Sequence, residues 1–179
     1  MSEGTGTVQS AENGTDFLLS VVLPIYNEEA CALECVRRLQ ATMQKLQCRY
    51  ELLFVNDGST DQTLSILRDE KSRDPSIKIL NFSRNFGHQP AISAGLDHAK
   101  GDAVVILDSD LQDPPEFIVQ LVAKWKEGHD VVHAQRRNRA GDSALKKILA
   151  AGYYRFLTRI SEVELPIDVG DFRLISRKA

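Results

Sequence analysis

Residues 101–116 read GDAVVILDSDLQDPPE, and this stretch carries the clearest signals for the fold and the chemistry of the chain. Residues 103–107 form an unbroken apolar run, long enough for one strand that is buried on both faces. Pro114 and Pro115, near the end of the quoted stretch, prevent the strand from continuing and favour the start of a helix. Because alternate residues of an extended segment point the same way, Asp108 and Asp110 are predicted to present two carboxylates to one side.

Two neighbouring carboxylates repel each other unless a cation sits between them. Mg²⁺ or Mn²⁺ suits oxygen ligands and would hold a diphosphate at its open coordination positions. An isolated D-x-D also occurs where acidic residues only solvate a strand end and cap the next helix. The rest of the chain therefore has to decide between a metal site and a solvated turn.

The composition is typical of one soluble globular domain, since 42% of the 179 residues are hydrophobic and 26% are charged. A net charge of -3 lacks the basic footprint of a general nucleic-acid binder, so no nucleic-acid partner is expected. No apolar run reaches the length of a membrane span and no signal peptide begins the chain, which favours a cytoplasmic protein without a transmembrane helix. Without C-x-x-C spacing or a histidine cluster, the cysteines are expected to be free thiols rather than zinc ligands. They are Cys31, Cys35 and Cys48.

Strand and helix signals alternate along residues 17–179, after a polar tail at residues 1–16 that we expect to be disordered. The predicted strands are residues 17–23, 51–55, 77–81, 103–107, 130–134 and 169–175. The predicted helices are residues 28–46, a segment capped by Ser59 or Thr60 that runs to 73, and residues 88–98, 115–126 and 143–160. Such alternation indicates an α/β fold whose mostly parallel sheet has helices on both faces.

Polar segments follow the predicted strands directly. Right-handed crossovers place the carboxyl ends of parallel strands on one edge, where open α/β sheets bind ligands. The segments are Tyr26-Asn27-Glu28, Asn56-Asp57, Ser83-Arg84-Asn85, Asp108-Ser109-Asp110 and Gln135-Arg136. Neither a G-x-G-x-x-G fingerprint nor a Walker loop is present to cradle phosphate through glycines. The pattern therefore predicts a nucleotide diphosphate held through a cation on the paired aspartates.

The chain resembles the family 2 glycosyltransferases of the GT-A fold in four motifs, which read VVLPIYNEE, VNDGSTDQT, SRNFGHQPAISAGLDHAKGDAVVILDSDLQDPPE and VVHAQRRNRAGDS. More narrowly, it is similar to the polyprenyl-phosphate glycosyltransferases, the group of dolichol-phosphate mannose synthase and the bactoprenol glucosyltransferases. The resemblance covers residues 18–177. It implies an inverting hexosyltransferase that uses Mg²⁺ or Mn²⁺, a UDP- or GDP-hexose donor and an undecaprenyl or dolichyl phosphate acceptor. Such enzymes serve cell-wall or lipopolysaccharide glycan synthesis.

The resemblance also implies roles for the donor side of the site. Pro24, Tyr26 and Glu28 would border the nucleoside, and Asp57 would hydrogen-bond the base or the ribose. For Asp57 the alternative is a turn residue ahead of a glycine, and for Tyr26 it is an aromatic lid over the core. Asp108 would contact the ribose or the metal ion. The metal ligands would be Asp108, Asp110 and Gln112.

An arginine-rich segment follows the fifth predicted strand. Arginine forks suit phosphate oxygens, and a hydroxyl at a helix start adds a donor near the positive end of the helix dipole. The resemblance places the acceptor lipid phosphate here, whereas the alternative is a solvated charge run. The residues concerned are Arg136, Arg137, Arg139 and Ser143.

Residues 144–160 contain lysines and arginines but no acidic residue, which predicts a basic amphipathic helix. Such a helix lies on an anionic bilayer or packs on its own domain; the family favours a peripheral position on the cytoplasmic face of a membrane. Asp171 lies where many members of the family carry a base, with a strand-end turn as the alternative. Close relatives continue into interfacial and membrane helices, a region that we expect this chain, which ends at Ala179, to lack.

Two other functions fit the same motifs. One is a glycosyltransferase of the same fold that acts on a saccharide or protein hydroxyl, for which Asp171 would be an essential base. The other is a nucleotide-sugar-binding protein without catalytic activity. The sequence leaves the nucleotide base, the sugar, the lipid length and a homo-oligomeric state open.

Overall fold

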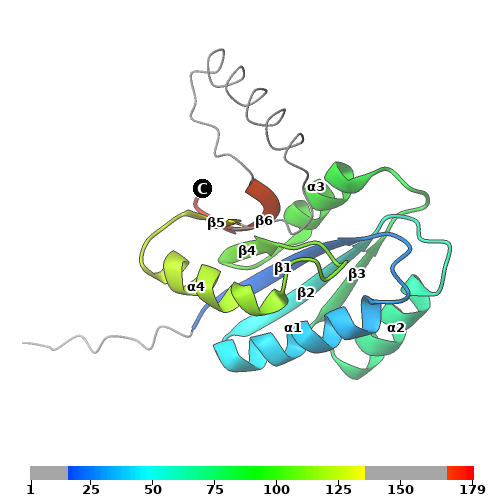
Figure 1. The fold of residues 1–179 in the computed structure, drawn as a ribbon, viewed down its shortest axis with the longest axis horizontal. Helices are drawn as coiled ribbons and strands as arrows, with labels where there is room; N and C mark the ends of the chain where they lie inside the picture. Colours follow the sequence, from blue (N-terminus) through cyan, green and yellow to red (C-terminus); the bar gives the residue numbers. More distant parts are fainter. Residues whose placement is uncertain (1–15, 136–168) are drawn as a thin grey trace, which may run out of the picture.

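The computed structural model describes residues 16–135 and 169–179 (Figure 1). Within these residues one mixed sheet has the strand order β3-β2-β1-β4-β6-β5. Its strands are β1 (Leu18–Ile25), β2 (Arg49–Asn56), β3 (Ile77–Asn81), β4 (Ala103–Ile106), β5 (Val131–Gln135) and β6 (Val169–Ser176). The helices are α1 (Ala32–Leu46), α2 (Thr63–Arg73), α3 (His88–His98) and α4 (Ile118–Lys126), and the 3₁₀ turn η1 (Pro115–Phe117) precedes α4. This arrangement confirms the predicted α/β class.

Only β6 runs against its neighbours in this sheet. Strands β3, β2, β1 and β4 pair in parallel, while β6 pairs antiparallel with both β4 and β5. Strand β5 therefore points the same way as β4. As a result, the carboxyl ends of five strands and the start of β6 lie at one edge of the sheet.

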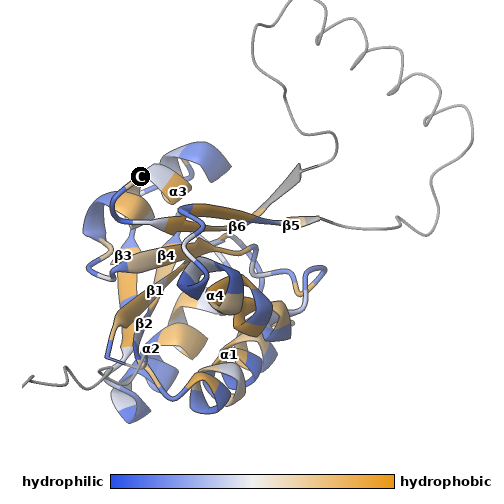
Figure 2. Cartoon of the chain, turned by 90° about the vertical axis from the view of Figure 1, so that its left-hand side faces the viewer, coloured by the Kyte–Doolittle hydropathy of each residue, from blue (hydrophilic) through white to orange (hydrophobic). Residues whose placement is uncertain are grey.

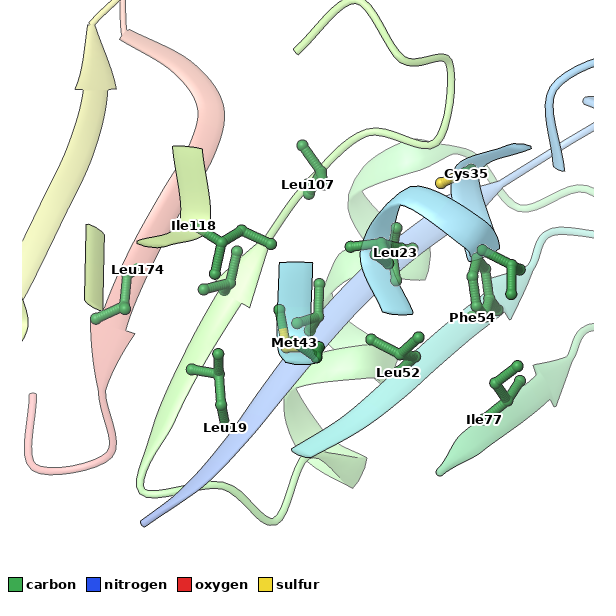
Figure 3. Packing of buried hydrophobic residues seen from close by; sticks show 14 of the residues in the cluster. Leu19, Leu23, Cys35, Met43, Leu52, Phe54, Ile77, Leu107, Ile118 and Leu174 are labelled. Atoms are coloured by element: carbon green, nitrogen blue, oxygen red, sulfur yellow. The ribbon is translucent and has the colours of Figure 1, made fainter. Parts of the chain in front are cut away.

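The helices cover the two faces unequally. Residues of α1, α2 and α4 pack with the strands into the larger core, whereas α3 packs on β1 and β2 from the other side (Figure 1). Figure 3 shows Leu23 and Phe54 of the sheet together with Cys35 and Met43 of α1 in this core. The strands are the most hydrophobic elements, and hydrophilic stretches lie on the outer sides of the helices (Figure 2). This burial provides most of the driving force for the fold.

Several predicted boundaries are confirmed and others are wrong. Strand β3 and helix α3 have the predicted bounds, and β6 ends one residue later than predicted. Helix α1 begins at Ala32 rather than at residue 28, because residues 28–31 form a turn in which the carbonyl of Glu28 accepts the N–H groups of Cys31 and Ala32. Helix α2 begins at Thr63, so neither Ser59 nor Thr60 is its N-cap.

Strand β1 also continues through Pro24, where we predicted that it would stop. Proline is tolerated in a strand where its missing N–H removes no ladder bond that the structure depends on. The paired part of β4 reaches only from Leu19 to Val22 of β1. Beyond it the carbonyl of Pro24 accepts a hydrogen bond of 3.0 Å from the hydroxyl of Ser109. The side chain of Ser109 thus forms a hydrogen bond to β1 beyond the last backbone pair between β1 and β4.

Some predictions fall outside the described residues: the disordered tail, apart from Asp16, the helix at 143–160, and the sites at Arg136, Arg137, Arg139 and Ser143. None of the helices within residues 16–135 and 169–179 is long and apolar enough to cross a membrane. Cys31, Cys35 and Cys48 are free thiols.

Candidate functional site

A cavity of about 320 Å³ opens at the carboxyl edge of the sheet. The loops that follow β1, β2, β3 and β4 all contribute to its wall, as the polar segments predicted. The lining residues are Pro24, Ile25, Tyr26, Glu28, Asp57, Asn85, Gly87, His88, Ala91, Asp108, Ser109 and Asp110. Open α/β sheets bind ligands at this edge, and the volume is in the range of small-molecule sites.

Asp57 lines the cavity and is buried, with only 3% of its surface exposed. One carboxylate oxygen accepts the N–H of Phe86 at 2.7 Å, and the other accepts the N–H of Gly87 at 2.9 Å. Its own N–H donates to the carbonyl of Ile25 at 2.9 Å. Asp57 therefore fixes the loop after β3 against the end of β1 and is more than a turn residue.

Gly58 brings the loops after β2 and β3 into backbone contact. Its φ of +71° lies in the left-handed region that glycine adopts without strain. A methyl group at this position would lie 2.4 Å from the carbonyl carbon of Arg84 and 2.7 Å from the nitrogen of Asn85. The N-D-G turn is therefore required by close packing as well as by its backbone angle.

The loops after β1 and β2 are clasped together around Asn27. The N–H of Asn27 donates to the hydroxyl of Ser59 at 2.9 Å, and its side-chain oxygen accepts the N–H of Thr60 at 2.8 Å. The next N–H, that of Glu28, donates to the hydroxyl of Thr63 at 2.9 Å. These bonds hold Tyr26 and Glu28 at the rim of the cavity. Since Tyr26 is 44% exposed, it is not a lid over the core.

The D-S-D motif lies in a turn rather than in a strand, because β4 ends at Ile106. Asp108 and Asp110 both line the cavity, as predicted from their spacing, although strand alternation is not the reason. The turn is anchored instead by Ser109, which is buried and donates to the carbonyl of Pro24. A residue with a small hydroxyl side chain therefore fixes the position of both aspartates.

A strained residue follows the motif. Leu111 has a φ of +61°, which is uncommon for a residue with a branched side chain. The N–H of Gln112 then donates to a carboxylate oxygen of Asp110 at 2.9 Å. The side chain of Gln112 is exposed and is not among the cavity residues. Its predicted role as a metal ligand stays a prediction.

His88 is a site residue that the sequence reading missed. It is the first residue of α3, it lines the cavity, and its Nε2 lies 3.5 Å from a carboxylate oxygen of Asp108. The signal was present, because His88 follows directly on a polar segment expected at this edge. The sequence pattern predicts only the start of a helix at this position.

The thiol of Cys31 lies behind the rim of the cavity. It donates to a carboxylate oxygen of Glu28 at 2.9 Å and lies 3.6 Å from the carbonyl oxygen of Ser109. Burial, together with the nearby charges of Glu28 and Asp110, raises the pKa of Cys31 to about 12. The thiol therefore stays neutral and links the first loop to the D-S-D turn without acting as a nucleophile.

The carboxylate oxygens in the cavity are suitable ligands for a hard cation such as Mg²⁺ that also binds the phosphates of a substrate. Within the described ranges no group of three His, Cys, Asp or Glu side chains is placed to hold a metal ion. Asp108 and Asp110 are two carboxylates on one cavity wall. Mg²⁺ is usually bound through one or two carboxylates together with substrate phosphates and water, so two protein carboxylates are sufficient for such a site.

Asp171 lies in the first half of β6, the strand next to β4. Antiparallel pairing sets Arg173 opposite Ile106. This pairing ends there, and Asp171 precedes Arg173 by two residues in β6, on the side toward the carboxyl end of β4. The predicted base therefore belongs to the same edge of the sheet as the cavity.

Comparison with known proteins gives a consistent result. The chain matches the model of the family described as Glycosyl transferase family 2 over residues 20–179. It is 52% identical over 159 residues to the uncharacterized glycosyltransferase YkcC of Bacillus subtilis, covering 89% of this chain and 49% of that protein. It is 42% identical over 160 residues to the bactoprenol glucosyl transferase of Shigella phage SfV, covering 89% and 52%. The chain thus spans about half the length of these relatives.

A solved structure shows the same fold at low sequence identity. The mannosyltransferase PcManGT from Pyrobaculum calidifontis, solved in complex with GDP-Man and Mn²⁺, superposes with a TM-score of 0.60 and 19% identity. The likeness covers 90% of this chain and 45% of that one. It confirms the predicted GT-A type of α/β fold.

Proposed function

The chain belongs to glycosyl transferase family 2, and we propose that it moves a hexose from a nucleotide-diphosphate sugar to a polyprenyl phosphate. The observation that carries the proposal is that three carboxylates from two loops, those of Asp57 after β2 and of Asp108 and Asp110 after β4, line one cavity. The 42% identity to a protein named bactoprenol glucosyl transferase supports the acceptor class.

The nucleoside part of the donor would occupy the side of the cavity formed by the loops after β1 and β2. The exposed ring of Tyr26 offers a face for stacking. Each carboxylate oxygen of Asp57 already accepts one N–H and has a second lone pair for a base N–H or a ribose hydroxyl. Pro24 and Glu28 complete this wall.

Asp108 and Asp110 would hold the cation, with Gln112 as the further predicted ligand. When bound, Mg²⁺ or Mn²⁺ would stabilise the negative charge that builds on the departing diphosphate. The Mn²⁺ and GDP-Man bound to PcManGT support both the cation and the class of donor. Ser109 contributes by holding the two aspartates in place through its bond to Pro24.

The reaction would bring two anions, the donor diphosphate and the acceptor phosphate, to one carbon atom. An oxygen of the lipid phosphate attacks the anomeric carbon from the side opposite the diphosphate, a new carbon–oxygen bond forms, and the nucleoside diphosphate leaves with the electron pair of the old bond. An α-linked donor gives a β-linked lipid phosphate. Because a phosphate monoester is already anionic, strong general-base help is not required. Asp171 would position the acceptor or serve as a weak base.

The predicted acceptor residues Arg136, Arg137, Arg139 and Ser143 complete the proposal. Arginine forks would bind the lipid phosphate in bidentate fashion. Since the acceptor is a lipid, we place the protein at the cytoplasmic face of a membrane. The basic helix that the sequence predicts at residues 144–160 would provide the contact with anionic lipid.

The direct test offers labelled UDP-glucose or GDP-mannose, with Mn²⁺, to the purified protein together with farnesyl phosphate or farnesol. We expect label to move to farnesyl phosphate and not to farnesol. Transfer to farnesol alone would replace the proposal by a hydroxyl-directed enzyme. Nucleotide binding with no transfer to either acceptor would indicate a binding protein.

The variant Asp171→Asn separates the two enzymatic versions further. Transfer to a phosphate should survive with a loss of about tenfold or less, because the nucleophile needs little deprotonation. A hydroxyl acceptor would lose its base, and the loss would then be much larger. Equal thermal unfolding of variant and wild type controls for damage to β6.

A further inference from the structure

Two basic side chains lie next to each other on β5 and β6, beyond the site described so far. His133 is the register partner of Arg173, and Arg173 is also the partner of Ile106 in β4. Phe172 and Leu174 are buried in the larger core, so Arg173 between them faces the opposite side of the sheet. His133 is exposed.

One nitrogen of the Arg173 guanidinium, Nε, is buried and has no hydrogen-bond partner. Arg173 as a whole is partly buried. Neither a hydrogen bond nor an ion pair joins it to any residue in the described part of the chain. A buried donor on a charged group is costly to leave unsatisfied, which is why such groups are normally paired with an anion.

His133 and Arg173 lie on one side of β4, and the loops after β1 and β2 lie on its other side. Ile106 precedes Asp108 by two residues, so Arg173 is one row of the sheet behind Asp108. Strands β6 and β5 flank β4 on one side, while β1, β2 and β3 flank it on the other (Figure 1). Among the described helices, α3 packs on β1 and β2 of this face. The loops after β1, β2, β3 and β4 line the cavity, and His133 and Arg173 lie on the two strands beyond β4, β6 and β5.

We propose that Arg173, assisted by His133, binds the phosphate of the acceptor. This inference rests on the proposed function and adds residues to it. A cation held by Asp108 and Asp110 would offset the charge of the donor diphosphate, but a second anion must still approach the same carbon. A planar guanidinium neutralises two phosphate oxygens through parallel hydrogen bonds and leaves the third oxygen to attack. His133 adds one further donor at the strand next to it.

Binding of farnesyl phosphate in the presence of UDP and Mn²⁺ tests the proposal without requiring turnover. The protein is titrated as wild type, Arg173→Gln and Arg173→Lys. Arg68→Gln, an exposed arginine on α2, is the control for loss of one charge. We expect Arg173→Gln to weaken farnesyl phosphate binding by about tenfold or more, since hydrogen bonds between charged groups are the strong ones. Arg173→Lys should restore part of the affinity, and UDP affinity should change less than about twofold.

The outcomes distinguish the acceptor from the donor. A loss of UDP affinity that equals or exceeds the loss for farnesyl phosphate would move Arg173 to the donor diphosphate and overturn the proposal. Unchanged farnesyl phosphate binding in Arg173→Gln would also overturn it, as would no binding by the wild type. Inorganic phosphate in place of farnesyl phosphate shows whether the phosphate alone is recognised. Lost farnesyl phosphate binding in a protein that transfers no sugar would retain the proposal for Arg173 and reject the proposed function.

Discussion

A buried carboxylate lies at each end of β2, and the two carboxylates have different hydrogen-bond partners. Glu51, near the start of the strand, is 2% exposed, and Asp57, just past its end, is 3% exposed. The oxygens of Glu51 accept bonds from the ammonium of Lys78, the hydroxyl of Ser20 at 2.5 Å and the N–H of Lys100 at 2.7 Å. Those of Asp57 accept only backbone N–H groups of a loop that lines a cavity.

This difference indicates that the amino edge of the sheet stabilises the fold, whereas the carboxyl edge forms the candidate ligand-binding site. At the amino edge the network closes on itself, because Gly101 donates in turn to the hydroxyl of Ser20 at 2.8 Å. At the carboxyl edge the hydrogen bonds join loops to one another and leave open space between them. Damage at the first edge should therefore reduce stability alone, whereas damage at the second should reduce ligand binding as well. The following variants compare the two edges or test one edge alone.

The largest effect is expected at Asp108. Replacing it by Asn keeps the shape but removes a charge from the cavity wall, so turnover with saturating donor should fall by about a hundredfold or more. The matched control is Asp102→Asn at the other end of β4, where Asp102 accepts the N–H of Leu18 at 2.8 Å. Turnover of that variant should stay within about threefold of wild type. Similar losses in both variants would remove the distinction between the edges.

Two glycines allow the same comparison through stability. A methyl group at Gly58 would lie 2.4 Å from a backbone atom, and one at Gly101 would lie 2.6 Å from the nitrogen of Ser20. Both alanine variants should lose about 2–4 kcal/mol of unfolding free energy, measured in urea. Only Gly58→Ala should also weaken nucleotide binding when measured well below the unfolding transition. An equal effect on nucleotide affinity would show that the amino edge is coupled to the site.

The buried charge of Glu51 predicts that the free energy of unfolding depends on pH. Burial by itself would raise the pKa of this carboxyl, but bonds from Lys78, Ser20 and the N–H of Lys100 outweigh burial and hold the pKa below its ordinary value of 4.5. A lowered folded-state pKa contributes stability above the ordinary value and loses it as the pH falls further. Unfolding free energy should therefore drop below pH 4.5 less steeply in Glu51→Gln than in wild type. Identical slopes would contradict this role.

The smallest effect is expected at Asn27, which clasps two loops of the site. Asn27→Gly keeps the positive φ of 54° and removes the acceptor of Thr60, at a cost of about 1 kcal/mol. The KM for the donor should rise about fivefold with little change in kcat, which corresponds to that free energy. Asn27→Asp retains an acceptor oxygen and should behave as wild type. A fall in kcat at constant KM would instead place Asn27 in the chemical step.

The sequence predicted the layers of the fold and most of the cavity, because both depend on local patterns. The apolar runs of β2, β3 and β4 and the polar residues after them determine which side chains reach the carboxyl edge. The contacts that fix those side chains could not be predicted, since they join residues far apart in the chain. The bonds from Phe86 and Gly87 to Asp57 and from Ser109 to Pro24 are of this kind.

The same limit explains the errors at helix starts. Serine and threonine are common N-cap residues, but Ser59 and Thr60 form hydrogen bonds with Asn27 of the preceding loop and do not cap α2. Tertiary contacts override a local preference there. His88 follows directly on a polar segment expected at this edge, but its position 3.5 Å from a carboxylate oxygen of Asp108 depends on how the loops fold together.

The most direct measurement is the calorimetric titration of UDP and GDP into wild type and Asp110→Ala, each with Mn²⁺ and with EDTA. If carboxylates of the carboxyl edge hold a diphosphate through a cation, Mn²⁺ should strengthen nucleotide binding to the wild type by about tenfold or more and leave Asp110→Ala unaffected. Binding by the wild type that is equally tight in EDTA, or an undiminished Mn²⁺ effect in Asp110→Ala, would contradict the assignment of this edge as the donor site.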